Sequence, residues 1–275
     1  MTPIPDIEAA GLSISARSDG EALPLVRDIS FAVPRGEITA LIGESGSGKS
    51  LTASVLLGLT DSDQYIVAFD RLRILNVELR AIDDAGFSGL RGTSVGYVTQ
   101  DPGRSLDPTM TVGDQIAELF VLHHGWSWTA ARQEAIRALD QVRIASAAAR
   151  AQDYPHSFSG GMQQRIVIAG AIALKPHILV ADEPTSALDV TVQAEILALI
   201  DELRRNMDMS VLLITHDLGI VYQLADQVLV MSKGEIVERG DAERICKAPA
   251  HAYTRNLVNA VPDITDAAVV SSHHG

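Results

Sequence analysis

A glycine-rich stretch near the N-terminus constrains the fold more than any other feature of the chain: Gly43-Glu44-Ser45-Gly46-Ser47-Gly48-Lys49-Ser50. It follows the apolar run 38–42 and precedes the largely apolar run 51–57, so the glycines lie at a predicted strand-to-helix turn. Such glycines let successive backbone N–H groups point at phosphate oxygens, and the positive end of the new helix faces the same anion. Lys49 is expected to reach the β- and γ-phosphates, and the Ser50 hydroxyl to bind Mg²⁺. A glycine-rich turn with an incidental lysine does not explain the spacing, flanks and final serine together, so the sequence predicts a nucleoside triphosphate site.

The composition limits the class of protein. At 275 residues the chain is long enough for one large domain, with or without a subdomain, given about 150 residues per domain. Lys and Arg total 22 against 35 Asp and Glu, a net charge of −13 without a basic block, so we expect no non-specific binding of nucleic acid. The longest apolar run, 166–174, falls short of the roughly 18–20 residues that span a bilayer, and residues 1–6 do not resemble a signal peptide. The single Cys246 can form no internal disulfide; we expect it to be a small filler near a helix, in a soluble chain of the reducing cytoplasm.

Apolar patterns in the first hundred residues predict strands. An antiparallel pair is expected before the glycine-rich stretch, with a polar loop at 17–21, and two strands after it. The strand-like segments are 6–15, 25–33, 72–75 and 94–99. The last of them ends at Gln100, where an open α/β sheet places side chains at the ligand crevice, so this amide could contact Mg²⁺ or an attacking water. A glutamine that caps a loop is the alternative.

Residues 111–175 show little strand pattern and predict a helical insert. Helical patterns cover 111–122, 129–143 and 160–174. Trp126 and Trp128 interrupt the insert in a polar loop, where they are either packing residues or a contact surface for a partner.

The last of these helices opens with Ser159-Gly160-Gly161. Ser159 suits the N-cap position, and the glycines leave the first-turn N–H groups open to an anion. A plain capped helix would explain the serine but not paired glycines, which destabilise a helix. We therefore predict a second phosphate-binding surface here.

A continuous apolar run at 177–181 ends in Asp182 and Glu183. This is the pattern of a buried parallel strand that delivers acids to the crevice at its carboxyl end. Asp182 would hold Mg²⁺, usually through water, and Glu183 would orient or deprotonate the attacking water. One acid after a strand is often a simple loop residue, but two, in a chain with a phosphate loop, favour function.

A second buried strand, 211–215, ends at His216. A helix at 190–206 with one apolar face precedes it, and a hairpin over 227–237 and a short helix at 251–262 follow. His216 is expected at the same crevice edge as Gln100 and Asp182, where its imidazole could hydrogen-bond the γ-phosphate. A lone histidine is more often structural, so we assign this role to His216 only because of its position at the end of a buried strand.

The order of these pieces resembles the ATP-binding subunit of ABC transporters over about residues 6 to 262. The resemblance implies an α/β fold, namely a P-loop NTPase core with a mixed sheet, an N-terminal antiparallel β subdomain and an inserted α-helical subdomain. In residue numbers it implies a single ABC ATPase domain over 1–275, with the RecA-like core and β subdomain at 6–100 and 176–240, the helical subdomain at 101–175, and a C-terminal helix and tail at 241–275.

The resemblance also implies ATP and Mg²⁺ as cofactors, together with the site residues. The motifs are a Walker A motif at 43–50, a Q-loop at Gln100, a signature motif at 159–163, a Walker B strand at 178–183, a D-loop at 186–189 and a switch histidine at His216. The implied nucleotide contacts are Gly43, Glu44, Ser45, Gly46, Ser47, Gly48, Lys49, Ser50, Leu51, Ser159, Gly160, Gly161 and Asp189. The implied metal contacts are Ser50, Gln100 and Asp182, and the implied catalytic residues are Glu183, His216 and Gln100.

Finer features resemble the oligopeptide, dipeptide and nickel importer branch. They lie at 106–108, 111–113, 154–162, 189–194 and 251–255, where His-Ala-Tyr-Thr-Arg is similar to the branch's His-Pro-Tyr-Thr-Arg. Three features depart from the family pattern. Met162 replaces a common glutamine, as is usual in the branch, and Ser157 replaces an acid or amide. The third departure is the absence of a longer C-terminal extension with a cysteine cluster. The last departure leaves a shorter, nickel-like or opine-metal-like member as an alternative.

The branch implies membrane partners. These are integral permease subunits, a second ABC ATPase expected to be a paralogue, and indirectly an extracytoplasmic solute-binding protein, with the chain peripheral on the cytoplasmic face of the inner membrane and no nucleic acid bound. A soluble ABC-type ATPase acting on nucleic acid or ribosomes would carry a coiled-coil insert or two cassettes, and a kinase would not need the Ser159 helix. Residues 18–26 contain no aromatic side chain to stack on a base, so we expect the base to be held weakly.

Overall fold

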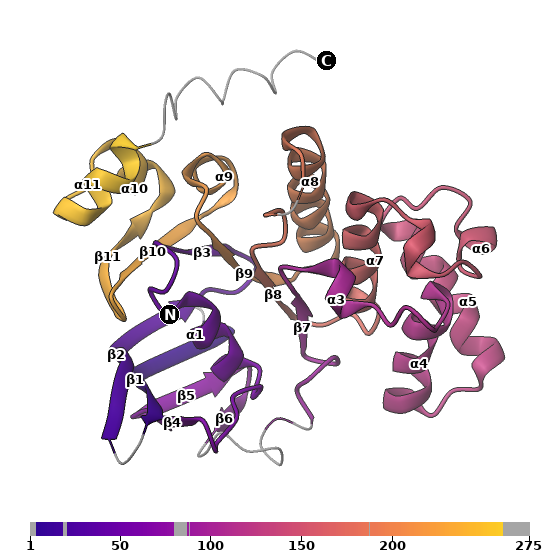
Figure 1. The fold of residues 1–275 in the computed structure, drawn as a ribbon, viewed down its shortest axis with the longest axis horizontal. Coiled ribbons are helices and arrows are strands. Elements are labelled where there is room, and N and C mark those ends of the chain that lie inside the picture. Colours follow the sequence, from indigo (N-terminus) through magenta and orange to yellow (C-terminus); the bar gives the residue numbers. More distant parts are fainter. Residues whose placement is uncertain (1–3, 19–20, 80–86, 88, 187, 261–275) are drawn as a thin grey trace. The chain divides into compact units, whose positions relative to one another are not determined.

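A computed structural model of the chain describes residues 4–18, 21–79, 87, 89–186 and 188–260 (Figure 1). The chain forms two compact units, residues 1–88 with 210–275, and residues 89–209. The expected division into core, helical subdomain and C-terminal tail stays a prediction, and the tail after residue 260 lies outside the described residues.

An antiparallel sheet forms the N-terminal part of the first unit. Its strands are β1 (Ile7–Ser18), β2 (Glu21–Val33), β4 (Tyr65–Ala68), β5 (Arg71–Ile74) and β6 (Val77–Leu79). The order is β2-β1-β5-β6, with β4 also paired to β1. The predicted antiparallel pair is confirmed, but the loop predicted at 17–21 is shorter, because Arg17 pairs with Ala22 and Ser18 with Glu21.

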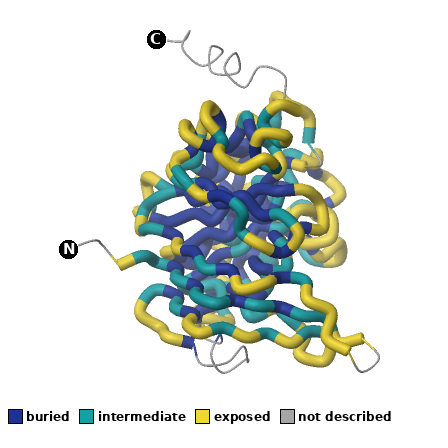
Figure 2. The backbone as a smooth tube through the Cα atoms, turned by 90° about the vertical axis from the view of Figure 1, so that its left-hand side faces the viewer, coloured by how far each residue is buried: buried dark blue, intermediate teal, exposed yellow. Residues whose placement is uncertain are grey.

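A second, mixed sheet completes the first unit. It contains β3 (Ile38–Ile42), β9 (Ser210–Thr215), β10 (Gln227–Ser232) and β11 (Glu235–Asp241). β3 pairs in parallel with both β9 and β10, while β10 and β11 form the predicted hairpin. Every residue of β3 and β9 is buried, which explains their continuous apolar sequences. Figure 2 shows the buried parts of the backbone in dark blue.

Short helices cover the mixed sheet of the first unit. They are α1 (Lys49–Leu56), α9 (Leu218–Leu224), α10 (Ala242–Lys247) and α11 (Ala252–Asn259). A buried cluster joins Ile42 and Val230 of the strands to Val221 of α9 and to Ile245 and Cys246 of α10. The prediction that Cys246 is a buried filler is confirmed. α11 lies within the range predicted for the terminal helix, of which residues 261 and 262 are outside the described part.

The second unit combines two parallel strands with a group of helices. The strands are β7 (Val95–Val98) and β8 (Ile178–Asp182), and the helices are α3 (Pro102–Ser105), α4 (Val112–His124), α5 (Trp128–Gln141), α6 (Ala147–Arg150), α7 (Gly160–Ile172) and α8 (Val190–Met207), with a 3-10 turn at Pro155–Ser157. α4, α5 and α7 confirm the helical patterns of the insert and lie together in Figure 1. An ion pair between Arg132 and Asp114 links α5 to α4.

Trp126 and Trp128 are each packed in part. Trp126 stacks on Phe120 with ring centroids 5.4 Å apart, and the Arg132 guanidinium lies 5.6 Å from the Trp128 ring. Both tryptophans remain 41% exposed. The sequence left open whether the two tryptophans are packing residues or a contact surface for a partner. In the structure both rings are partly packed and partly exposed.

Within the described ranges, we find no helix with the length and apolar character needed to cross a membrane.

Candidate functional site

The phosphate loop in the first unit begins where β3 ends, and its path requires glycine at Gly43. This residue has φ 152°, and a Cβ there would lie 2.0 Å from the backbone oxygen of Met231. The parallel pairing of Ile42 with Val230 explains this approach, since it brings the end of β10 beside the start of the loop. The loop is thus seated directly against the sheet.

Lys49 is the first residue of α1, and its side chain folds back over the loop. The residue is only 5% exposed, and its Nζ donates hydrogen bonds of 2.8 Å to the Gly43 carbonyl and 2.9 Å to the Glu44 carbonyl. These carbonyl oxygens hold the ammonium in place. A buried positive charge therefore lies inside the loop, where it favours an anionic ligand.

The loop has further features that fit a phosphate chain. Ser47 is 4% exposed, and its Oγ has no hydrogen-bond partner among the residues that the structure describes. A buried hydroxyl in this position costs free energy unless a ligand supplies the partner. The N-cap of α1 is Gly48, which has no side chain to cap the first turn, and the exposed Ser50 and partly buried Leu51 follow in that turn. These residues fit the polyphosphate of a nucleotide.

His216 leaves the sheet next to the phosphate loop. Ile42 of β3 pairs with Thr215 of β9, so Gly43 and His216 each follow directly after paired residues of adjacent parallel strands. His216 is exposed, and the next residue, Asp217, caps α9 by accepting the Gly219 N–H at 2.8 Å. The edge that carries the loop therefore also carries this imidazole.

Two of the predicted site residues, Gln100 and Glu183, follow the two strands of the second unit. Val98 of β7 pairs with Ala181 of β8, so the residues that follow run side by side. Gln100 Nε2 donates a hydrogen bond of 3.3 Å to Glu183 Oε2. The structure thus brings together two residues that the sequence selected separately.

Asp182 has a partner that the sequence analysis missed. The Tyr97 hydroxyl hydrogen-bonds to the Asp182 carboxylate, which is in a residue only 6% exposed. Burial and the negative charge of Asp182 raise the pKa of Tyr97 to about 12, so the phenol stays protonated and can act as the donor. The sequence offered one indication, a tyrosine in the strand that ends at Gln100, but the pairing of β7 with β8 was needed to interpret it.

Glu183 adopts an uncommon backbone conformation. Its φ is 46°, in the left-handed region that non-glycine residues rarely occupy. This backbone conformation costs about 1–2 kcal/mol of free energy, and it persists where the surrounding structure fixes it. The Ser186 N–H donates to the Glu183 carbonyl at 3.2 Å and closes the turn that holds this carboxylate at the end of β8.

The signature segment and Asp189 have structural roles of their own. Ser159 caps α7 by accepting the Met162 N–H at 3.4 Å, as predicted, and Asp189 caps α8 by accepting the Val192 N–H at 3.1 Å. A Cβ on Gly161 would lie 2.6 Å from Val192 Cγ1, so close packing of α7 on α8 explains this glycine without a ligand. A Cβ on Gly160 would lie 3.7 Å from Leu188 Cδ2, an ordinary contact distance. Packing therefore does not require a glycine at this position, and Gly160 is the residue that indicates a helix start open to an anion.

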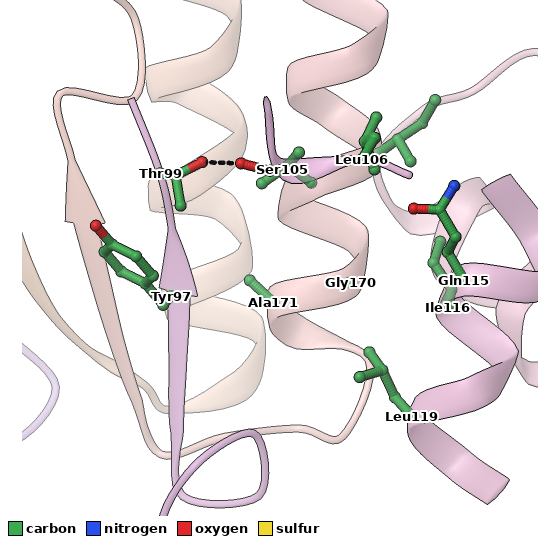
Figure 3. Close-up of a pocket in the computed structure, with 11 residues that line it drawn as sticks. Tyr97, Thr99, Ser105, Leu106, Gln115, Ile116, Leu119, Gly170 and Ala171 are labelled. Atoms are coloured by element: carbon green, nitrogen blue, oxygen red, sulfur yellow. Dashed lines mark hydrogen bonds between the residues drawn. The ribbon is translucent and has the colours of Figure 1, made fainter. Parts of the chain in front are cut away.

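A groove of about 280 Å³ opens beside β7 within the second unit (Figure 3). Tyr97 and Thr99 line one side, Leu106 and α4 residues such as Leu119 another, and Gly170 and Ala171 of α7 the floor. Thr99 and Ser105 share a hydrogen bond at its rim. The lining is largely apolar. The ring of Tyr97 forms part of this lining, and the hydroxyl of the same side chain interacts with Asp182.

Comparison with solved structures shows which proteins share this fold. The chain matches the dimeric structure of MJ0796, a bacterial ABC transporter cassette, with a TM-score of 0.74 at 24% identity, over 86% of this chain and 98% of that one. It matches cbiO1 from Clostridium perfringens, part of the ABC transporter complex cbiONQ, with a TM-score of 0.71 at 24% identity, over 88% and 90% of the two chains. The chain therefore shares the fold of these ABC transporter cassettes, and the predicted α/β fold class is confirmed.

Sequence comparisons agree with the fold. Residues 26–186 match the family model described as ABC transporter, and residues 237–272 match the one described as oligopeptide/dipeptide transporter, C-terminal region. The chain belongs to the ABC transporter family, as an ATP-binding subunit with the C-terminal region of the oligopeptide/dipeptide type. This confirms the resemblance found in the sequence.

Curated relatives extend the match to individual proteins. The glutathione import ATP-binding protein GsiA of Salmonella paratyphi A (strain ATCC 9150 / SARB42) is 45% identical over 263 residues, which cover 94% of this chain and 42% of that protein. GsiA of Escherichia coli (strain K12) is 46% identical over 258 residues, covering 92% and 41%. The chain thus spans less than half the length of these relatives.

Proposed function

We propose that the chain hydrolyses ATP to power an ABC importer of di- or oligopeptide-like solutes. The observation that carries this proposal is the phosphate loop, where a buried Lys49 and the unpartnered Ser47 hydroxyl form a cradle for a polyphosphate. The match of residues 237–272 to a peptide-transporter region, and relatives named for glutathione import, support a peptide-like solute over nickel or a metal chelate.

Each candidate site residue would have its own role. Residues 43–51 of the first unit would bind the phosphates, with His216 at the same strand edge. Glu183 of the second unit would accept a proton from the attacking water, and Gln100 would fix the orientation of that carboxylate. Mg²⁺, when bound through Ser50 and Asp182, would neutralise negative charge on the phosphates. Tyr97 would keep the Asp182 carboxylate in one orientation by donating its hydroxyl hydrogen.

Hydrolysis is proposed to need a second ATPase subunit. Ser159, Gly160 and Asp189 lie in the second unit, at the starts of α7 and α8, and would contact the nucleotide bound to the partner's phosphate loop. A paralogous ATPase is the proposed partner, since the importer branch that the chain resembles implies one. The MJ0796 structure, which is described as dimeric, supports an assembly of this kind.

Integral permease subunits are the proposed membrane partners. An ATPase that powers import must contact the protein that moves the solute, and the apolar groove beside Tyr97 offers a surface for a permease segment. This would hold the chain on the cytoplasmic face of the membrane, while a solute-binding protein outside would deliver the solute. The net charge of −13 does not favour the alternative, an ATPase that acts on nucleic acid or ribosomes.

A co-purification experiment tests the proposed function. The chain, expressed with candidate permease subunits and a second ATPase, should purify with them and hydrolyse Mg-ATP faster in the complex than alone. Leu119→Lys should weaken the association by placing a charge in the groove, whereas Leu122→Lys, at a 71% exposed position of the same helix outside the groove lining, should not. Fast turnover by a strict monomer, or association that neither variant changes, would contradict the proposal.

A further inference from the structure

The first turn of α11 touches the phosphate loop from the other end of the chain. The backbone N–H of Glu44 donates a hydrogen bond of 2.9 Å to the Tyr253 hydroxyl, across 209 positions of sequence. Glu44 is the second residue of the loop, and its carbonyl accepts from Lys49 Nζ at 2.9 Å and from the Ser47 N–H at 3.2 Å. The N–H of Glu44 shares its peptide group with the carbonyl of Gly43, which also accepts from Lys49 Nζ, at 2.8 Å. The Gly43–Glu44 peptide group therefore stands between the Tyr253 hydroxyl and the Lys49 ammonium.

Tyr253 is itself held firmly. Glu238 of β11 is 8% exposed, and its carboxylate accepts the Ala250 N–H at 2.8 Å and the His251 N–H at 3.0 Å, just before α11 begins. The ring of Tyr253, with Leu257 one turn later, packs against the buried cluster under α9 and α10. The helix that carries the hydroxyl is thus anchored to the mixed sheet and cannot shift without breaking these contacts.

The β10–β11 hairpin supports the loop at a second point. The Gly234 N–H at the hairpin turn donates to the Ser47 carbonyl at 3.0 Å. The same hairpin supplies Glu238, which anchors α11. Hairpin and helix together form one support, which holds the loop at Ser47 and at Glu44.

We propose that Tyr253 is a positioning residue for nucleotide binding, in that its hydroxyl fixes the Gly43–Glu44 peptide group, whose carbonyl, that of Gly43, holds Lys49 in the loop. The proposal rests on the proposed binding of ATP at residues 43–51. A glycine-rich loop can adopt several conformations, and binding to one of them is weakened by the fraction of time spent in the others. A hydrogen bond to the Glu44 N–H raises the population of the conformation that the structure shows.

The test compares Tyr253→Phe with Tyr222→Phe. Both changes remove one hydroxyl from a partly buried ring on the same buried cluster, but the Tyr222 ring faces Lys247 instead of the loop. On the full chain, titration with a non-hydrolysable Mg-ATP analogue should show binding about three- to tenfold weaker for Tyr253→Phe, the usual effect of one lost hydrogen bond, and unchanged for Tyr222→Phe. The melting temperature of Tyr253→Phe should stay within about 2 °C of the wild type, and in turnover assays KM should rise while kcat changes little.

Hydrogen exchange supplies a second measurement that needs no nucleotide. The Glu44 amide hydrogen, followed by mass spectrometry of loop peptides, should exchange several-fold faster in Tyr253→Phe and at the wild-type rate in Tyr222→Phe. Wild-type affinity and exchange in Tyr253→Phe, or equal losses in both variants, would overturn the inference while leaving ATP binding intact. A wild-type chain that binds no Mg-ATP would overturn the proposed function, and the inference with it.

Discussion

Gln100 and Glu183, 83 positions apart in the chain, are joined by a hydrogen bond of 3.3 Å from the amide of one to the carboxylate of the other. The neighbouring acid has a comparable partner, since the Tyr97 hydroxyl bonds to Asp182. Both partners come from β7 or the residue shortly after it, and both acids from the end of β8. One parallel strand pair therefore orients the two carboxylates that we assign to metal binding and to proton transfer.

Glu183→Gln should retain ATP binding and lose hydrolysis. The amide is isosteric with the carboxylate but cannot accept the proton of the attacking water, and general-base assistance is worth about 10²-fold or more. Phosphate release and nucleotide titration, measured in parallel, separate the two effects. Glu202→Gln is a matched control, because Glu202 forms an exposed ion pair with Arg143 in the same unit, away from the strand ends. Hydrolysis at the wild-type rate in Glu183→Gln would reject this residue as the base.

Tyr97→Phe should raise the Mg²⁺ concentration needed for half-maximal hydrolysis. Loss of a hydrogen bond to a charged group costs about 1.5–3 kcal/mol, or about 10- to 100-fold in apparent affinity. The pKa of Tyr97 is about 12, so the hydroxyl is protonated and the difference between variant and wild type should not change between about pH 6 and pH 9. Tyr154→Phe, in a 42% exposed ring stacked on His156, is the control. An unchanged Mg²⁺ requirement would show that Asp182 does not depend on this contact.

The sequence predicted the parts of the site that are contiguous in the chain. The run 38–42 is buried at every position, and the glycines, Lys49 and Ser50 follow it at the spacing that phosphate binding requires, so local pattern and function coincide. The same holds for β8 with Asp182 and Glu183. Short elements such as β4, β6, α9 and α10 were missed, because three to seven residues give little periodicity and their placement depends on the sheet beneath them.

Contacts across long sequence separations could not be predicted. Tyr97 and Asp182 meet only because β7 and β8 pair in one register, and Tyr253 reaches Glu44 only because Glu238 anchors α11 beside the hairpin. Gly161 has two explanations, of which the sequence offered only one. Its pairing with Gly160 suggested a ligand, whereas the approach of Val192 from a different helix supplies a packing reason.

Glu238→Gln should destabilise the first unit in a pH-dependent way. Burial raises the pKa of Glu238, but the Thr254 hydroxyl, the Ala250 and His251 N–H groups and Arg244 hold it below its ordinary value of 4.5. A lowered pKa in the folded state means that the carboxylate contributes stability above about pH 4.5, and that this contribution is lost as the pH falls through the folded-state pKa. Glutamine offers one acceptor oxygen and one NH₂ donor to two N–H groups, which should cost about 1–3 kcal/mol at pH 7.

Urea unfolding of the wild type and the Glu238→Gln variant at several pH values measures this effect. The difference in unfolding free energy should be largest near neutral pH and shrink below the ordinary carboxyl pKa, where the wild-type residue becomes protonated. Glu243→Gln, in an exposed ion pair with Lys247 on α10, should show little difference at any pH. A difference for Glu238→Gln that stays constant down to about pH 4 would mean that its charge does not anchor α11.

The base of the nucleotide should be held weakly, so that ATP and GTP bind within about tenfold of each other. In the described residues 21–26, at the start of β2, the side chains include the 58% exposed Leu23 but no aromatic ring. Stacking on an aromatic side chain is worth about 1–3 kcal/mol per base, whereas leucine offers only non-directional apolar contact. Most of the binding free energy should therefore come from the phosphates and Mg²⁺, which the two nucleotides share.

Competition titration of ATP against GTP on the isolated chain measures the preference, and Leu23→Tyr should strengthen the binding of both nucleotides if the base lies near this strand. A preference for ATP above about a hundredfold would show that another part of the chain recognises adenine.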